Sequence, residues 1–372
     1  MKYYIIAGEA SGDLHAANLM KALKKTDPQA EFRFWGGDLM EREGGTPVKH
    51  YRDLAFMGFA EVIMNLGTIL KNISFCKEDI KKWDPHVIIF VDYPGFNLRI
   101  AKWARKEGYK THFYISPQIW AWKENRIKDI QRDIDEMYVI LPFEKDFYEQ
   151  KHNFKVNFVG HPLIDEIAER PPADVNKVKV ECDLDNRPVI ALLPGSRKQE
   201  ISKMLEIMLS VTQDFKDYQF VIAGAPSQEE AFYRRFIKKS NVHLVMNRTY
   251  DLLEISTAAL VTSGTATLET ALLKVPEVVC YKGNFISYQI AKRVINLEYI
   301  SLVNLIMQRE VVKELIQSDF DRQNLKKELL KILDQENRKK IFSDYYELEK
   351  KLGGKGASEK TAQLIYQKIS AS

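Results

Sequence analysis

Four short clusters of small and charged residues stand directly after apolar runs, and they hold the residue types that could do chemistry. They span residues 8–13, 92–97, 194–197 and 263–269. Glycine lets the backbone approach a ligand closely, arginine offers two parallel donors to phosphate oxygens, and a carboxylate can accept a proton. These types suit the binding of phosphate and sugar groups and proton transfer.

Asp92 is the candidate for proton transfer. It follows five apolar residues, 87–91, and a carboxylate at the end of such a run is partly desolvated. Desolvation raises the pKa of a carboxyl group and makes it a usable general base. Because Asp92 also precedes Pro94 and Gly95, it could equally serve only to form a turn.

In the first cluster, Glu9 stands just after a short apolar run and suits sugar hydroxyls better than a phosphate. Asp13 could simply cap a helix that starts at Leu14. The cluster is not a P-loop, because no lysine follows its second glycine. It also lacks the dinucleotide-binding fingerprint, because Ala10 and Asp13 stand at positions where that fingerprint needs glycine.

The third cluster contains Gly195, Ser196 and Arg197, which follow the apolar run 189–193. Gly195 would let a ligand approach the backbone, and Arg197 could bind phosphate oxygens. The alternative is an arginine in a surface loop. The pairing of this cluster with the fourth favours phosphate binding.

The fourth cluster, with Ser263, Gly264 and Thr265, leads into a predicted helix. The free N–H groups and the dipole at a helix start bind anions. Glu269 falls one turn inside that helix and could accept both hydroxyls of a ribose. An acidic residue near a helix start is also favoured by the dipole alone.

His161 follows another predicted strand, but a lone histidine is more often structural than catalytic. Trp120 and Trp122 could stack on a sugar or belong to a core. The sequence has no H-E-x-x-H motif, no paired aspartates for a metal and no G-x-S-x-G motif. We therefore expect no metal and no cofactor, and serine-hydrolase chemistry has no support.

Strands and helices alternate along the chain, and the clusters lie between them. Apolar runs predict strands at 3–7, 87–91, 111–115, 136–140, 155–159, 189–193, 219–223, 258–262 and 278–281, with helical patterns such as 14–25 between them. Such alternation is typical of parallel sheets covered on both faces. Because ligands bind at the carboxyl ends of these strands, the clusters should gather there.

A polar stretch with two prolines, residues 169–174, divides the chain. We predict an α/β protein of two doubly wound, Rossmann-like domains, residues 1–168 and 175–340, that face an interdomain cleft. From residue 311 the pattern is mostly helical and charged. A last helix is expected at about 358–369, and the segment from about 345 to 372 could join the first domain.

We expect a cytoplasmic protein. The 372 residues include 55 basic and 51 acidic side chains, and the net charge of +4 is too balanced to imply nucleic-acid binding. The three cysteines lie far apart, which argues against a disulfide framework or a cysteine zinc site. The N-terminal apolar run, residues 3–7, is too short for a signal peptide, and no run is long enough to span a bilayer.

In their order along the chain, these clusters resemble those of the lipid-A-disaccharide synthases, a family of bacterial glycosyltransferases. The matching stretches are residues 8–13, 57–62, 92–97, 116–122, 142–144, 159–163, 193–197, 262–269 and 301–305. The resemblance implies a metal-independent GT-B enzyme that moves 2,3-diacylglucosamine, with inversion, from its UDP conjugate to 2,3-diacylglucosamine 1-phosphate. The products would be UDP and lipid A disaccharide 1-phosphate.

The resemblance also implies where the two substrates bind. It assigns to the UDP-donor site of the second domain Gly195, Ser196, Arg197, Ser263, Gly264, Thr265, Glu269 and Asn304. It assigns to the acceptor site of the first domain Ser11, Asp13 and Asn97, with Asp92 as the base for the acceptor's 6-hydroxyl and Glu9 and His161 as alternatives. The family often has an acidic residue where this chain has Gly95, so the identity of the base stays open.

Residues 56–83 predict a long helix with one apolar row at spacings of three and four. A second apolar row in its first half must also be buried, by protein, a partner subunit or lipid. Because the implied substrates carry acyl chains, we expect Met57, Phe59 and Met64 to face lipid and nearby lysines to meet anionic head groups of the inner membrane. A homodimer is also compatible with the family.

Three other functions stay open. A UDP-N-acetylglucosamine 2-epimerase shares the GT-B architecture, but it would need acid/base pairs around the sugar and no acyl-chain site. A sugar-nucleotide sensor would bind UDP without turnover. A dinucleotide-dependent oxidoreductase is the weakest alternative, because its fingerprint is absent from both glycine-rich turns.

Overall fold

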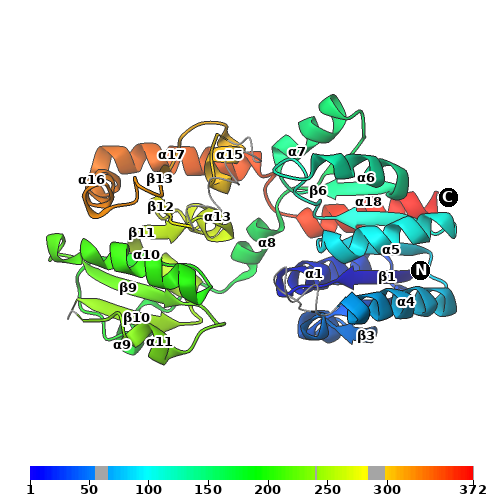
Figure 1. Ribbon diagram of the computed structural model, residues 1–372, viewed down its shortest axis with the longest axis horizontal. Helices are drawn as coiled ribbons and strands as arrows, with labels where there is room; N and C mark the ends of the chain where they lie inside the picture. The colour runs from blue at the N-terminus through cyan, green and yellow to red at the C-terminus, as the bar shows by residue number, and fades with distance from the viewer. Residues whose placement is uncertain (55–65, 239–240, 284–297, 372) are drawn as a thin grey trace. The chain divides into compact units, whose positions relative to one another are not determined.

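The computed structural model (Figure 1) describes residues 1–54, 66–238, 241–283 and 298–371. The chain forms two compact units, the first of residues 1–165 and 352–372 and the second of residues 166–351. The division falls inside helix α8 (Pro162–Glu169), before the polar stretch 169–174. That stretch is fixed to the second unit, because Arg170 pairs with Asp251 and the Ala173 N–H donates to Glu254.

The first unit is built on a parallel sheet of seven described strands in the order β3-β2-β1-β4-β5-β6-β7. The strands are β1 (Lys2–Ala7), β2 (Glu31–Gly36), β3 (Thr46–His50), β4 (Val87–Val91), β5 (Thr111–Tyr114), β6 (Glu136–Val139) and β7 (Asn157–Phe158). The order reverses between β1 and β4, since the chain first adds strands on one side of β1 and then returns to its other side. Ligands of doubly wound sheets bind at such a reversal.

Helices cover both faces of this sheet. Helices α4 (Leu66–Trp83), α5 (Pro94–Lys106) and α6 (Ile127–Asp133) contribute buried side chains to one core with Tyr4 and Phe90 of the strands. Other α-helices in the described part of the unit are α1 (Ala10–Thr26), α2 (Asp38–Arg42), α7 (Pro142–Asp146) and α18 (Ala357–Ser370). Helix α18, red in Figure 1, packs against α1 although it ends the chain.

Hydrogen bonds fix the C-terminal segment in the first unit. The Asp165 carboxylate accepts from the N–H groups of Gly356 and Ala357 at 2.6 and 2.9 Å, at the start of α18. The His161 N–H donates to the Leu352 carbonyl at 3.0 Å. Residues 345–351 stay in the second unit as the end of α17 (Gln335–Lys351).

The second unit has a parallel sheet of six described strands in the order β10-β9-β8-β11-β12-β13. The strands are β8 (Val189–Leu193), β9 (Gln219–Gly224), β10 (Val242–Met246), β11 (Ser256–Thr262), β12 (Glu277–Tyr281) and β13 (Lys313–Ile316). The described helices besides α17 are α9 (Val175–Glu181), α10 (Lys198–Ser210), α11 (Glu230–Arg234), α12 (Thr249–Glu254), α13 (Thr265–Leu272), α15 (Leu302–Met307) and α16 (Arg322–Leu333). The strand order reverses between β8 and β11, as it does between β1 and β4.

The predicted fold class, two doubly wound α/β domains, is confirmed. All nine predicted strands are present, but β2, β3, β10 and β13 were not predicted because polar residues interrupt them. After residue 311 the chain is mostly helical, as predicted, and the short strand β13 precedes these helices. Helix α1 begins at Ala10, not at Leu14, so Asp13 is inside the helix and is not its cap.

Helix α4 begins at Leu66 in the described part of the chain. Residues 55–65, which include Met57, Phe59 and Met64, lie outside the described residues. Across the parts that the structure describes, no helix is both long and apolar enough to cross a bilayer.

One buried carboxyl group of the second sheet has a consequence for stability. Glu277 of β12 is 1% exposed, and within the described chain neither of its side-chain oxygens has a hydrogen-bond partner. Burial, together with the charge of Glu314, raises the pKa of Glu277 well above its ordinary value. The folded state therefore favours the protonated form of this carboxyl group more than the unfolded chain does.

Glu277→Gln should stabilise the protein at neutral and alkaline pH. Below the unfolded pKa both states hold the proton, and as pH rises above it the wild-type folded state must retain a proton that the unfolded chain loses. The apparent melting temperature of the variant should thus exceed that of wild type by about 2–4 °C or more at pH 8, with a smaller difference at pH 5. A pH-independent difference, or the same gain from the exposed-site control Glu336→Gln, would contradict this account.

Candidate active site

The reversal between β1 and β4 brings the first two sequence clusters together. Ala7 and Val91 are register partners at the ends of these strands, so Gly8 and Asp92 follow at the same edge. Asp92 and Tyr93 are both left-handed, with φ of 47° and 50°. The Tyr93 ring lies against Gly8 so closely that a Cβ there would stand 2.2 Å from the ring. Residue 8 must therefore be glycine.

Asp92 has the environment of a general base. Burial and the charge of Glu9 raise the pKa of Asp92 to about 6, although a hydrogen bond from the Tyr93 N–H opposes the shift. The Asp92 N–H donates to the Tyr114 carbonyl at 3.1 Å, which holds the backbone. A carboxylate with a pKa near 6 is ionised at neutral pH and is a stronger base than an ordinary aspartate.

Asn97, a predicted acceptor-site residue, holds the backbone of Asp92 in place. It is fully buried, and its side-chain amide donates to the Asp92 carbonyl at 2.6 Å and to the Ile6 carbonyl at 3.3 Å. These bonds tie the β1 end to the turn after β4. Direct contact with an acceptor does not fit this burial, so the structure gives Asn97 a positioning role.

Asp13 also has a different role from the predicted one. Its carboxylate is buried and accepts from the N–H groups of Gly37, Leu39 and Met40 at 2.7, 3.1 and 3.2 Å. It therefore fixes the start of α2 instead of capping its own helix or meeting an acceptor. Ser11, by contrast, is exposed at the start of α1.

The two alternative bases, His161 and Glu9, have surroundings that differ from those of Asp92. Burial, with a contribution from His15, lowers the pKa of His161 to about 3. The Nδ1 atom of His161 accepts from the Leu163 N–H at 3.2 Å, so the ring proton resides on Nε2. Such a ring is a poor proton acceptor and a good hydrogen-bond donor. Glu9 is exposed at the start of α1.

The reversal between β8 and β11 forms the corresponding edge of the second unit. A pocket of about 260 Å³ opens there, and it is lined by predicted donor residues of both clusters, Gly195, Ser196, Ser263, Gly264, Thr265 and Glu269. Gly195 is left-handed, with φ of 100°, and a Cβ there would stand 2.3 Å from Glu200. The first-turn N–H groups of α13 are the anion-binding feature of this pocket.

Arg197 does not line this pocket. It is exposed at the start of α10 and lines a neighbouring cavity of about 390 Å³ with Lys198, Lys203 and Lys282. Glu200 lines both cavities. The positive charge near the donor pocket thus comes from a group of side chains, of which only Arg197 was predicted.

Glu269 is a half-buried carboxyl group of the donor pocket. Burial and the charge of Glu166 raise the pKa of Glu269 to about 7, while a hydrogen bond from Tyr250 lowers it in part. The Tyr250 hydroxyl also donates to Glu166 at 3.4 Å. Glu166 and Tyr250 were not predicted, because Tyr250 follows the unpredicted strand β10 and Glu166 precedes the polar stretch 169–174.

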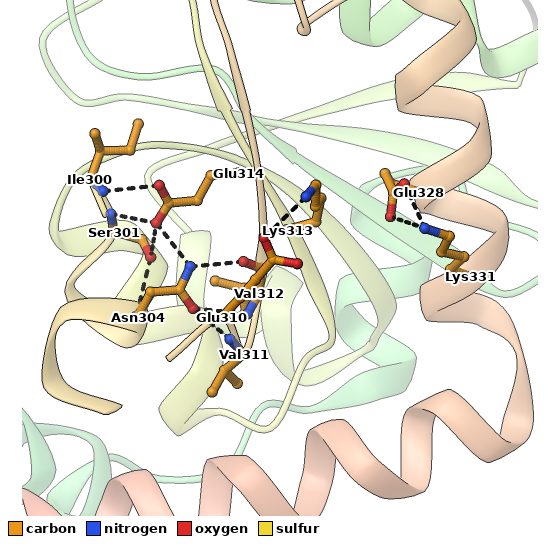
Figure 2. A network of polar contacts seen from close by, with 10 residues as sticks. All are labelled: Ile300, Ser301, Asn304, Glu310, Val311, Val312, Lys313, Glu314, Glu328 and Lys331. Carbon is orange, nitrogen blue, oxygen red and sulfur yellow. Dashed lines mark hydrogen bonds and ion pairs between the residues drawn. The ribbon is translucent and has the colours of Figure 1, made fainter. Parts of the chain in front are cut away.

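Asn304 belongs to the network that Figure 2 shows. It is fully buried, its amide group donates to Val312 and Glu314, and its oxygen accepts from the N–H groups of Val311 and Val312. All its side-chain atoms are thus bonded within the protein, which corrects the expectation of direct donor contact.

The same network reaches the donor pocket through one further bond. The Glu314 carboxylate accepts from the N–H groups of Ile300 and Ser301 at 2.9 and 3.0 Å (Figure 2). The Ile300 carbonyl accepts from the hydroxyl of Ser263, which lines the pocket, at 3.1 Å. Asn304 therefore supports the pocket indirectly.

No group of three or more His, Cys, Asp or Glu side chains within the described ranges is arranged to hold a metal ion. Any diphosphate in the donor pocket would meet the α13 start and the neighbouring basic side chains.

Solved structures with the same architecture bind UDP or UDP-sugars. A Staphylococcus aureus MnaA structure with UDP aligns with a TM-score of 0.70 at 12% identity, over 100% of this chain and 98% of that one. The Neisseria meningitidis UDP-GlcNAc 2-epimerase bound to UDP-GlcNAc aligns with a TM-score of 0.64 at 15% identity, over 100% of both chains. At these identities the likeness shows the GT-B fold alone.

Sequence relatives distinguish among the functions of that fold. A lipid-A-disaccharide synthase of Syntrophus aciditrophicus is 38% identical over 376 residues, which cover 99% of this chain and 98% of the relative. One of Coxiella burnetii is 37% identical over 372 residues, with 98% of each chain covered. The family model described as lipid-A-disaccharide synthetase matches residues 3–369. The chain therefore belongs to the lipid-A-disaccharide synthetase family and is a glycosyltransferase of lipid A biosynthesis.

Proposed function

We propose that the protein transfers 2,3-diacylglucosamine from its UDP conjugate to the 6-hydroxyl of 2,3-diacylglucosamine 1-phosphate. The proposal rests on one observation above all. Each sheet has its candidate site where its strand order reverses. In the first unit this site holds the Asp92 carboxylate, whose pKa is raised, and in the second unit it holds a pocket suited to an anion. The acceptor would bind to the first unit and the donor to the second.

In the proposed reaction, Asp92 removes the proton of the acceptor's 6-hydroxyl as its oxygen attacks the anomeric carbon of the donor sugar. The bond from that carbon to the UDP oxygen breaks on the opposite face, so the configuration inverts. The α13 start and the basic group around Arg197 stabilise the charge that develops on UDP. Glu269 binds the ribose hydroxyls, and Glu9 keeps the pKa of Asp92 high.

The first test is UDP release with both acylated glucosamine substrates. Release should require the acceptor, and Asp92→Asn should lower kcat about 100-fold or more because the base is lost. UDP affinity should stay unchanged, since Asp92 lies in the first unit. UDP release without acceptor would contradict transfer, and a nearly active Asp92→Asn variant would show that the base is elsewhere.

The pH profile tests the role of Glu9 in the same assay. Activity of wild type should rise through about pH 6 as Asp92 loses its proton. Glu9→Gln removes a negative charge that raises the pKa of Asp92, so the acid limb should move to lower pH. Glu31→Gln, on the exposed start of β2, is the matched control and should leave the limb in place. An unmoved limb in Glu9→Gln would separate Glu9 from the base.

Glu269→Gln and Arg197→Ala should each weaken UDP binding about tenfold, the usual scale for losing one charge-assisted hydrogen bond. Calorimetry with UDP is the measurement, and Glu336→Gln in the same unit is the control. Because protein groups balance the diphosphate charge in this proposal, turnover should persist in excess EDTA. Loss of turnover in EDTA with recovery on adding Mg²⁺ would overturn the charge assignment.

We further propose that the first unit binds the inner membrane peripherally through α4. Leu70 and Phe75 are 54% and 47% exposed on this helix, unusually for large apolar side chains. Exposed lysines at 71, 81 and 82 accompany them. An apolar surface with a basic border suits anionic lipid head groups over acyl chains.

Leu70→Asp should reduce sedimentation with vesicles that contain anionic lipid, without a change in melting temperature. Leu330→Asp offers a matched control, because Leu330 of α16 in the second unit is exposed to the same degree, 53%. Equal loss of binding in both variants, or none in either, would exclude α4 as the membrane contact.

A further inference from the structure

The loop that follows β5, residues 115–123, is held in one shape by a buried carboxyl group. Glu144 of α7 is 1% exposed and accepts from the Ser116 hydroxyl at 2.6 Å and the Trp120 indole N–H at 3.3 Å. It also accepts from the N–H groups of Ile140 and Leu141 at 3.2 and 2.9 Å. These four donors occupy the acceptor capacity of one carboxylate.

The backbone of this loop is strained at two residues. Ile115 is left-handed, with φ of 65°, which is rare for a β-branched residue, and Lys123 is left-handed with φ of 57°. Further contacts hold the loop, since the Tyr148 hydroxyl donates to the Pro117 carbonyl and the Phe143 ring packs edge-on against Trp120 at 4.8 Å. Backbone strain that surrounding contacts maintain in this way is typical of functional sites.

What the loop exposes is an aromatic ring with a cation on its face. Trp122 is 50% exposed, whereas its neighbour Trp120 is bonded to Glu144. The Lys123 ammonium lies over the face of the Trp122 ring, 4.1 Å from the ring centre. An exposed indole can stack on the apolar face of a sugar, and the ammonium can pair with a phosphate.

The loop also lies at the edge of the sheet where Asp92 is found. Strand β5 is the neighbour of β4, and the Asp92 N–H donates to Tyr114, the last residue of β5. A hexose whose 6-hydroxyl reaches Asp92 therefore has the loop after β5 as one of its neighbours at this edge. In the proposed acceptor, the ring carbon that carries the 6-hydroxymethyl group and the anomeric carbon that carries the phosphate both flank the ring oxygen, so the phosphate binds close to the 6-hydroxyl.

We infer that Trp122 and Lys123 form the subsite for the phosphorylated end of the acceptor, a sugar 1-phosphate, and that Glu144 is the positioning residue that presents them. This inference rests on the proposed function and extends it. Lys123 pairs with the phosphate monoester, and Trp122 stacks on the sugar ring.

The experiment compares two acceptors, 2,3-diacylglucosamine with and without its 1-phosphate. Wild type should have the lower KM for the phosphorylated acceptor. Lys123→Met keeps the apolar stem but removes the charge, so it should raise that KM about tenfold or more and leave the KM of the other acceptor unchanged. Lys123→Arg should restore the preference, and Lys128→Met, an exposed lysine on α6, should not alter it.

The role of Glu144 has its own readout. Glu144→Gln and the milder Ser116→Ala should both move the ratio of the two KM values toward one, with kcat and UDP affinity retained. A variant that only lost stability would lower the active fraction and leave the ratio unchanged. Trp122→Ala should raise both KM values, because stacking does not depend on the phosphate.

Two results would overturn the inference. One is a Lys123→Met variant that keeps the preference for the phosphorylated acceptor, and the other is loss of vesicle binding with an unchanged KM ratio, which would assign the pair to lipid head groups. Failure of the proposed function is distinguishable, because wild type would then show no acceptor-dependent UDP release. If wild type turns over normally, only the subsite is in question.

Discussion

The packing of the Tyr93 ring against Gly8 governs the candidate catalytic edge of the first unit. The ring can lie there only because residue 8 has no Cβ, and two successive left-handed residues bring it there. A left-handed non-glycine residue costs about 1–2 kcal/mol, so such a turn needs external support. Asn97 and the Tyr114 carbonyl supply that support through the backbone of Asp92. The carboxylate is thereby fixed beside β1, where burial and the charge of Glu9 raise its pKa.

The strand order of the second sheet also reverses, but the space at that reversal is arranged differently. Between β8 and β11 the space is left open by Gly195 and by the small residues before α13, so a pocket replaces the packed ring. Asn304 and Glu314 support that pocket indirectly, because Glu314 holds the backbone of Ile300, whose carbonyl accepts from the pocket residue Ser263. One topology thus places a carboxylate of raised pKa at the reversal of one sheet and an open pocket at the reversal of the other.

The sequence was sufficient for the sheets because their central strands are unbroken apolar runs. It also predicted where Asp92 and Glu269 lie in the fold, directly after β4 and in the first helix after β11. It was insufficient for edge strands such as β3 and β10, whose polar residues hide the pattern. It also could not show that Asp13 and Asn97 turn inward, since Gly37 and Ile6, with which they form hydrogen bonds, are distant in the chain. Tyr250 and Glu144 were missed as site residues for the same reason, because their roles depend on contacts that no local pattern encodes.

Two carboxyl groups with raised pKa values, those of Asp92 and Glu144, illustrate what the structure adds to the sequence patterns. Burial raises the pKa of both Asp92 and Glu144, to about 6 and about 7, so the shift alone does not separate a base from a structural group. The hydrogen bonds do separate them. Glu144 accepts from four donors and has no capacity left for a ligand, whereas the described chain gives the Asp92 carboxylate a single donor, the Tyr93 N–H. A carboxylate has about four acceptor positions, so Asp92 retains room for a substrate hydroxyl and Glu144 does not.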